Sequence, residues 1–127
     1  MSVFNLKTPM LYRCQVHHYH ARLSRLYIRA FKGQAQLAAF YLLFSDVGYW
    51  EGPVSWQGIA FEVAPKDECI DLMLNTGMVG PAIRQFPDAY ASLTDHVNLY
   101  ITPTGHLPVR IIAGSASRIV DIPPELR

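Results

Sequence analysis

The 127-residue chain is half hydrophobic and only 17% charged, a balance typical of a folded domain and not of a disordered chain. Its longest apolar run spans residues 37–44, far short of the roughly 20 residues that a membrane-spanning helix needs. The composition therefore excludes the disordered and membrane-spanning classes. We expect one compact domain over residues 1–127.

Charge is divided unevenly along the chain. Residues 1–45 carry six lysines and arginines and no acidic residue, whereas residues 46–127 carry five basic and ten acidic residues. A basic segment of this kind suits an anionic partner such as nucleic acid, but halves of opposite sign can also complement each other within a fold or across a dimer. We favour complementation, because a dedicated nucleic-acid domain is usually basic throughout.

The two cysteines and the first residues bear on the location of the protein. Cys14 and Cys69 lie far apart without CxxC spacing, so we predict buried free thiols. The opening residues, MSVFNLKTP, lack the apolar stretch of a secretory signal. Both observations favour a cytoplasmic protein.

The spacing of apolar residues in segment 11–32 fits both a helix and a pair of strands. The apolar residues recur at three- and four-residue steps, as in an amphipathic helix, but they also alternate over residues 12–16 and 26–31, as in strands. Aromatic and β-branched side chains pack better on a pleated sheet, so we predict two strands with a break in phase at residues 18–24, and the helix remains the alternative. A turn at Lys32–Gly33 then leads into the run 37–44, which we predict to be a central strand.

An aromatic segment follows this run. Tyr49, Trp50 and Trp56 flank a turn at Gly52–Pro53, and residues 59–63 alternate as in a strand. Tyrosine and tryptophan combine a large apolar area with a polar tip, which suits an interface, so these three residues are candidate partner-binding residues. The alternative is that they cover an open end of the sheet.

Helix signals gather in residues 65–95. Pro65 is suited to the first helical turn, and Asp67 and Glu68 place negative charge at the positive end of the helix dipole. Gly77 is the predicted stop, and further short helices are expected near residues 80–81 and 87–88. The predicted buried face consists of Ile70, Met73, Leu74 and Met78.

Strand signals return after His96, with a turn at Pro103–Gly105. We expect the small residues at 114–117 either to bend the last strand or to let another backbone approach closely. The order of elements predicts an α+β fold with a mainly antiparallel sheet of about five or six strands. Two or three short helices from residues 65–95 are expected to pack on one face of that sheet.

Few residues suggest chemistry. His18 and His20 would share one strand face beside Cys14 and Val16, which is a workable pair of zinc ligands, but a zinc site needs a further ligand such as His96 or His106. We therefore predict no metal and no cofactor, with His18 and His20 as the candidate ligands if a metal is bound. No nucleophile elbow, phosphate-binding loop or dinucleotide motif is present, and we predict no catalytic residue.

We expect a non-catalytic interaction module that self-associates, as a homodimer, or binds another protein through Tyr49, Trp50 and Trp56. One alternative is an anion- or nucleic-acid-binding domain that uses the basic segment 13–32, with Arg22, Arg25 and Arg29 interleaved among aromatic residues. A second alternative is a small metal- or histidine-dependent enzyme.

Overall fold

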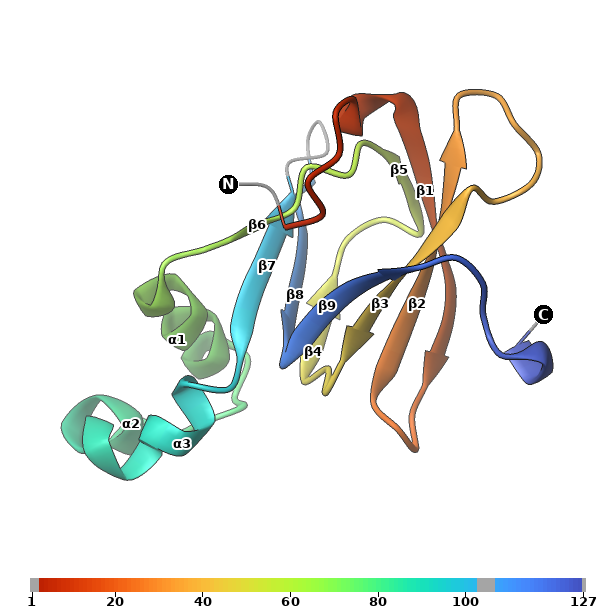
Figure 1. Ribbon diagram of the computed structural model, residues 1–127. Helices are drawn as coiled ribbons and strands as arrows, with labels where there is room; N and C mark the ends of the chain where they lie inside the picture. The colour runs from red at the N-terminus through yellow and green to blue at the C-terminus, as the bar shows by residue number, and fades with distance from the viewer. Residues whose placement is uncertain (1–2, 103–106, 127) are drawn as a thin grey trace.

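The computed structural model describes residues 3–102 and 107–126. In these ranges nine strands form two antiparallel sheets, and the three α-helices lie to one side of them (Figure 1). The predicted α+β class is confirmed, although the strands are divided between two sheets instead of one sheet of five or six. The predicted turn at Pro103–Gly105 and His106 lie outside the described residues.

The first sheet has five strands in the order β5-β1-β2-β3-β9. Their bounds are β1 Tyr12–His20, β2 Arg25–Lys32, β3 Phe40–Ser45, β5 Ser55–Gln57 and β9 Ser115–Ile119. The second sheet has the order β4-β8-β7-β6. Its strands are β4 Tyr49–Glu51, β6 Glu62–Val63, β7 Asn98–Thr102 and β8 Val109–Ala113.

Six short helices complete the described elements. The α-helices are α1 Lys66–Asn75, α2 Ala82–Gln85 and α3 Ala91–Thr94, and the 3-10 helices are η1 Pro9–Leu11, η2 Pro87–Tyr90 and η3 Pro124–Leu126. The predicted helical region at residues 65–95 is therefore confirmed. No helix in the described ranges has the length and apolar character needed to cross a membrane.

Residues 11–32 form the β1–β2 hairpin, as the strand interpretation predicted. Pairing runs in register from Tyr12 to Val16 and then shifts, so that His17 is the extra residue of a β-bulge. The bulge changes which side chains of β1 face outward, because one inserted residue reverses the alternation that follows it. The following strand, β3, begins at Phe40 and not at Leu37, whose side chain is 84% exposed.

The main hydrophobic core lies between the two sheets. The inner face of the five-stranded sheet contributes buried side chains from β2 and β3, and β7 and β8 contribute from the other side. Phe44 lies at the centre of this core, with ring centroids 5.4 Å from both Phe61 and Tyr100 and 6.0 Å from Phe4. These edge-to-face contacts join the sheets as a sandwich.

Gly114 separates β8 from β9, and the chain passes there from one sheet to the other. A Cβ atom at this position would lie 3.1 Å from the Asp46 side chain and 3.4 Å from the His96 carbonyl oxygen. The backbone amide of Gly114 also donates a hydrogen bond to the Ser45 carbonyl, at 2.9 Å. The small residue therefore allows the close approach on which this sharp change of sheet depends.

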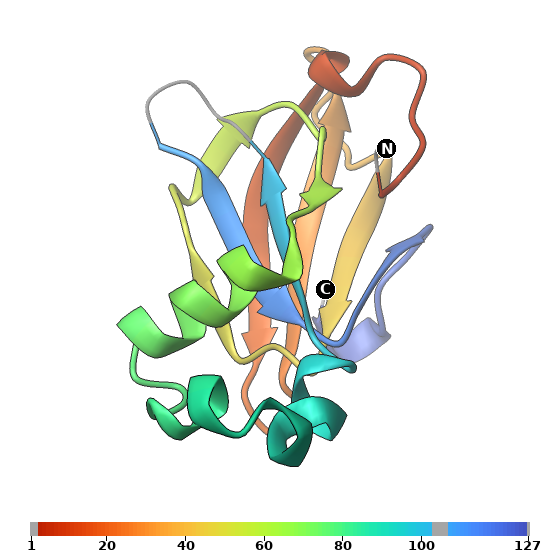
Figure 2. The same cartoon turned by 90° about the vertical axis from the view of Figure 1, so that its left-hand side faces the viewer.

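α1 covers the outer face of the four-stranded sheet (Figure 2). Its buried side chains are Cys69, Leu72 and Met73, which pack against Leu99 and Ile112. This face is rotated from the predicted one. Ile70 and Leu74 are half-buried, and Met78 is 36% exposed because the helix ends at Asn75 and Gly77 turns the chain with a φ of +77°.

Candidate functional site

The outer face of the five-stranded sheet is basic. Because Leu26, Ile28 and Ala30 of β2 point into the core, the alternate residues of that strand point outward, and the register carries the alternation to β1 and β3. We call this surface the basic face, and it comprises Arg13, His18, His20, Arg25, Tyr27, Arg29, Phe31 and Tyr41. The five strands of this sheet, all within the described ranges, contain no aspartate or glutamate.

Arg29 occupies the centre of the basic face. It lies on the middle strand, paired with Gln15 of β1 on one side and with Tyr41 of β3 on the other. The residue is half-buried and its Nε atom is buried without a hydrogen-bond acceptor. Among the described residues no carboxylate or carbonyl group pairs with its guanidinium. Partial burial of a cation without a counter-charge is unfavourable, so Arg29 is a natural point for an anion to bind.

Phe31 lies beneath two guanidinium groups. The Arg13 Cζ atom is 4.6 Å from the centre of the Phe31 ring and the Arg29 Cζ atom is 5.9 Å from it. Arg13 is also held by a 3.2 Å hydrogen bond that its Nη2 donates to the Ala35 carbonyl. The ring is only 7% exposed, so the outermost surface here is arginine lying on an aromatic ring. A guanidinium plane fixed in this way can accept a stacked base as well as an anion.

The bulge at His17 brings the other two histidines onto the basic face. His18 pairs with Tyr27 and His20 with Arg25, so both lie opposite to Cys14 and Val16, and the prediction that they share a face with those residues is wrong. Their ring centroids are 6.0 Å apart. His17 also reaches this face, because its ring centroid lies 5.8 Å from that of Tyr41, and its Nε2–H group donates to the Leu126 carbonyl of η3 at 2.7 Å.

The hydrogen bonds of His20 bear on metal binding. The Leu23 amide donates to its Nδ1 atom at 3.2 Å, so the neutral ring carries its proton on Nε2. In that form Nε2 is an outward hydrogen-bond donor and not a metal ligand. His96, a predicted third ligand, lies beside α3 and its Nδ1 atom contacts the Ser92 carbonyl. Within the part of the chain that the structure describes, no group of three potential metal ligands is assembled.

The structure places the predicted arginines on the same hairpin. Arg25 and Arg29 share the outward side of β2, and Arg22 is exposed in the turn between β1 and β2. Arg13 was not singled out from the sequence, although it alternates in phase with Gln15 and faces Phe31 across the hairpin. Arg13, Arg25 and Arg29 therefore lie on the same side of the β1–β2 hairpin, with Arg22 in its turn.

The predicted aromatic residues are not gathered in one place. Trp56 is 7% exposed within the main core, and its indole N–H donates to the Gly58 carbonyl at 2.9 Å. Trp50 packs half-buried against the same core, while Tyr49 packs on the opposite side of β4 near α1. Burial, followed by a hydrogen bond to Glu51, raises the pKa of Tyr49. Adjacent strand residues point to opposite faces, which separates Tyr49 from Trp50.

Comparison with protein-family models, with curated proteins and with solved structures finds no match to this chain. A function is therefore argued from the charge and geometry of its surfaces. The basic face is the described surface where half-buried cations, aromatic rings and an absence of acidic strand residues coincide.

Proposed function

We propose that the protein is a cytoplasmic, non-catalytic module that binds single-stranded nucleic acid on the basic face. The observation that carries the proposal is Arg29, which is half-buried at the centre of that face without an acceptor among the described residues. A phosphate group supplies the missing acceptor, since guanidinium groups bind phosphate oxygens in bidentate fashion.

The neighbouring residues fit an extended strand better than an isolated anion. Arg13 lies flat on Phe31 and presents a plane on which a base can stack. Arg25 and Arg22 continue the positive charge toward the hairpin turn, and His20 adds an Nε2–H donor beside Arg25. Base stacking without specific hydrogen bonds predicts binding with little sequence preference.

The test is fluorescence anisotropy with a labelled oligo-dT of about 15 nucleotides, a length that exceeds one single-strand site on typical small folds. Three or four phosphate contacts predict that log K falls with log salt with a slope of about −2 to −3. Arg29→Gln should weaken binding about tenfold at low salt, because one charge-assisted contact is lost.

The matched control is Arg84→Gln, which removes a cation from α2 next to α1. That variant should bind as the parent does. Equal losses in both variants, or an affinity that does not depend on salt, would contradict the proposal.

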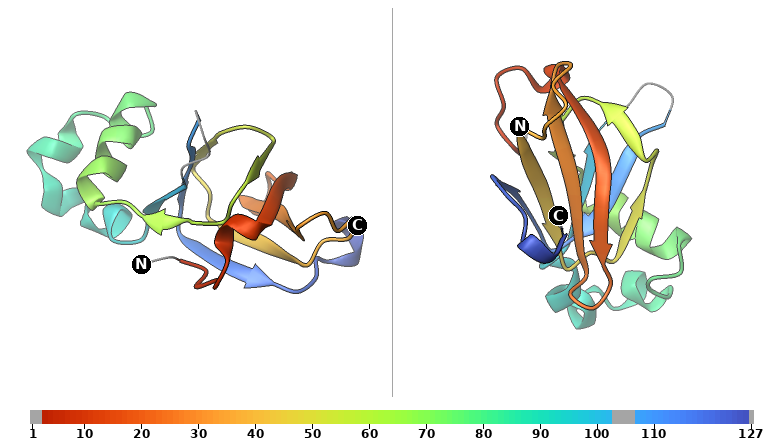
Figure 3. Two further views of the ribbon diagram at one scale, coloured as in Figure 1. Left: turned by 90° about the horizontal axis from the view of Figure 1, so that it is seen from above. Right: turned by 90° about the vertical axis from the view of Figure 1, so that its right-hand side faces the viewer.

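A second candidate function, self-association, is supported by the distribution of acidic residues. Asp67, Glu68 and Asp71 lie on α1, at the opposite end of the molecule from the β1–β2 hairpin (Figure 3, left). Contact between opposite charges of two copies would then be head-to-tail, and such contacts form open chains instead of a closed two-fold dimer. This geometry changes the expected product from a homodimer to a series of oligomers.

Sedimentation velocity over a concentration and salt series tests this second candidate. Head-to-tail association predicts a sedimentation coefficient that rises continuously with concentration at low salt and falls as salt is added. A monomer that persists at micromolar concentration at all salt levels would exclude it.

A further inference from the structure

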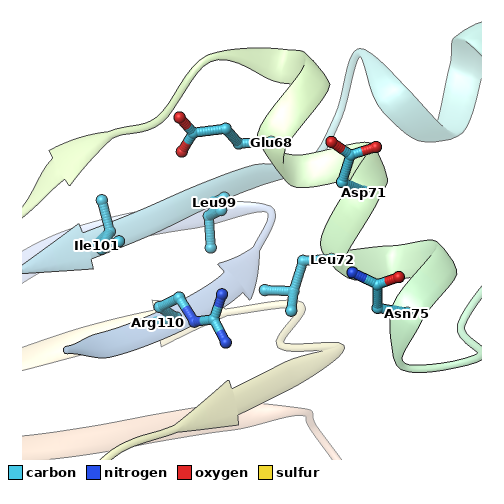
Figure 4. Close-up of a pocket in the computed structure, with 7 residues that line it drawn as sticks. All are labelled: Glu68, Asp71, Leu72, Asn75, Leu99, Ile101 and Arg110. Atoms are coloured by element: carbon cyan, nitrogen blue, oxygen red, sulfur yellow. The ribbon is translucent and has the colours of Figure 1, made fainter. Parts of the chain in front are cut away.

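A cavity of about 250 Å³ lies away from the basic face, between α1 and the outer face of the four-stranded sheet (Figure 4). Leu99 and Ile101 of β7 line it together with Leu72 of α1, and Arg110 of β8 faces Leu72 from the sheet. The cavity therefore has an apolar floor with polar groups at its margin, as small-molecule sites usually have.

The spacing of residues along α1 explains the polar margin. Glu68, Leu72 and Asn75 recur at steps of four and three residues and so lie on one side of the helix. Leu72 also belongs to the buried cluster beneath the helix, with Cys69 and Met73, so it lies where the cavity meets that cluster. One side of α1 thus supplies a carboxylate, an apolar side chain and an amide to the same cavity.

Glu68 is the charged residue of the cavity lining for which no ion pair is found among the described residues. Arg110 forms an ion pair with Glu51 of the neighbouring strand, and Asp71 forms one with Arg84. Among the described residues the Glu68 carboxylate has no ion-pair or hydrogen-bond partner. Figure 4 shows it at the end of the cavity where Leu99 and Ile101 form the floor. An exposed carboxylate without an ion-pair partner therefore lies at the margin of an apolar surface.

We propose that this cavity binds a small organic cation that consists of a primary ammonium group on an apolar body. The ammonium group pairs with Glu68, and the apolar body contacts Ile101 and the small exposed parts of Leu72 and Leu99. The volume of about 250 Å³ is below the roughly 300–1,000 Å³ of pockets that hold drug-sized ligands, which restricts the ligand to a compact amine. The site is independent of nucleic-acid binding.

Phenethylamine, protonated at neutral pH, is a suitable probe, and 2-phenylethanol is its neutral analogue of similar shape. In a ¹⁵N NMR titration phenethylamine should cause saturable shifts in the amides of α1, β7 and β8. The alcohol should bind about tenfold more weakly, because it forms no charge-assisted hydrogen bond with the carboxylate.

Two variants separate the proposed contact from general electrostatic attraction. Glu68→Gln should lower phenethylamine affinity about tenfold. Asp67→Asn removes the same charge from the adjacent position of α1, which does not line the cavity, and should change the affinity by less than about twofold. Circular dichroism melts confirm that both variants are folded.

Four results would overturn the proposal. They are the absence of saturable shifts at millimolar phenethylamine, shifts confined to another surface, equal affinities for the amine and the alcohol, and equal losses in the two variants.

Discussion

The outer faces of the two sheets differ in their side chains and in what covers them. The outer face of the four-stranded sheet presents Leu99 and Ile112, and α1 covers them with Leu72 and Met73. The outer face of the five-stranded sheet presents cations and aromatic rings, and the helices of residues 65–95 lie on the other side of the molecule (Figure 3). One face is therefore covered by α1, whereas none of the helices of residues 65–95 covers the other.

The basic face nevertheless differs from an ordinary solvent-exposed sheet face, because two of its aromatic side chains are buried. Tyr27 and Phe31 are only 3% and 7% exposed, although the helices of residues 65–95 lie on the other side of the molecule. The guanidinium groups of Arg13 and Arg29 lie over the Phe31 ring, and the His18 ring lies 6.5 Å from the Tyr27 ring. A cover made of arginine keeps positive charge at the surface, which a covering helix would remove. The difference between the two faces thus indicates where a partner is expected to bind.

The largest expected effect concerns the covered face. Leu72→Ala should lower the free energy of unfolding by about 2–5 kcal/mol, since it leaves a cavity beneath α1. Leu37→Ala, at a position 84% exposed, is the control and should change that energy by less than about 0.5 kcal/mol. Urea unfolding followed by circular dichroism measures both. Equal stability of the two variants would show that α1 does not hold the sheet.

A pH effect tests the core between the two sheets. Burial raises the pKa of the Cys14 thiol from 9.0 to about 12. Between these values the unfolded chain releases the proton and the folded chain retains it, so alkali favours unfolding. The contribution to the unfolding free energy should fall by about 1.4 kcal/mol for each pH unit above 9. Urea unfolding from pH 8 to 10.5 should show a shallower decline in Cys14→Ala, and identical slopes would mean that the thiol is not buried.

The sequence was sufficient for the elements whose pattern is local. Alternation over residues 12–16 and 26–31 predicted the β1–β2 hairpin, and the proline and acidic residues at 65–68 predicted the start of α1. The helix face was misjudged because the expected apolar stripe extended to Met78, beyond the turn at Gly77. The small residues at 114–117 predicted a bend or a close approach of another backbone, but the sequence did not show that the chain changes sheets at Gly114.

The orientation of the histidines on the basic face depends on a β-bulge at one residue, which no local sequence pattern predicts. His17 is the extra residue of the bulge, and no turn or glycine at that position marks it in the sequence. Without the bulge, His18 and His20 would have faced inward with Cys14 and Val16. The arginines of segment 13–32 were identified from charge alone, but the lack of a counter-charge at Arg29 is a property of the fold. Trp56 was a candidate because of its residue type, and the fold places it in the core.

The smallest expected effect on stability concerns the basic face. Arg29→Met keeps an apolar side chain against Phe31 and removes a half-buried cation without an acceptor. The free energy of unfolding should stay unchanged or rise by up to about 1 kcal/mol, while oligo-dT binding weakens. Chemical denaturation and anisotropy on the same preparation measure the two quantities. A decrease of more than about 2 kcal/mol in the free energy of unfolding would mean that Arg29 stabilises the fold, which would contradict a role in binding alone.

The most direct test of the account is to locate the bound strand by NMR. Oligo-dT added to ¹⁵N-labelled protein at low salt should shift the backbone amides of β1, β2 and β3 around Arg29, and leave those of α1 and β7 unchanged. Shifts centred on α1 and the four-stranded sheet, or none at saturating oligonucleotide, would contradict the central claim that the uncovered basic face is the binding surface.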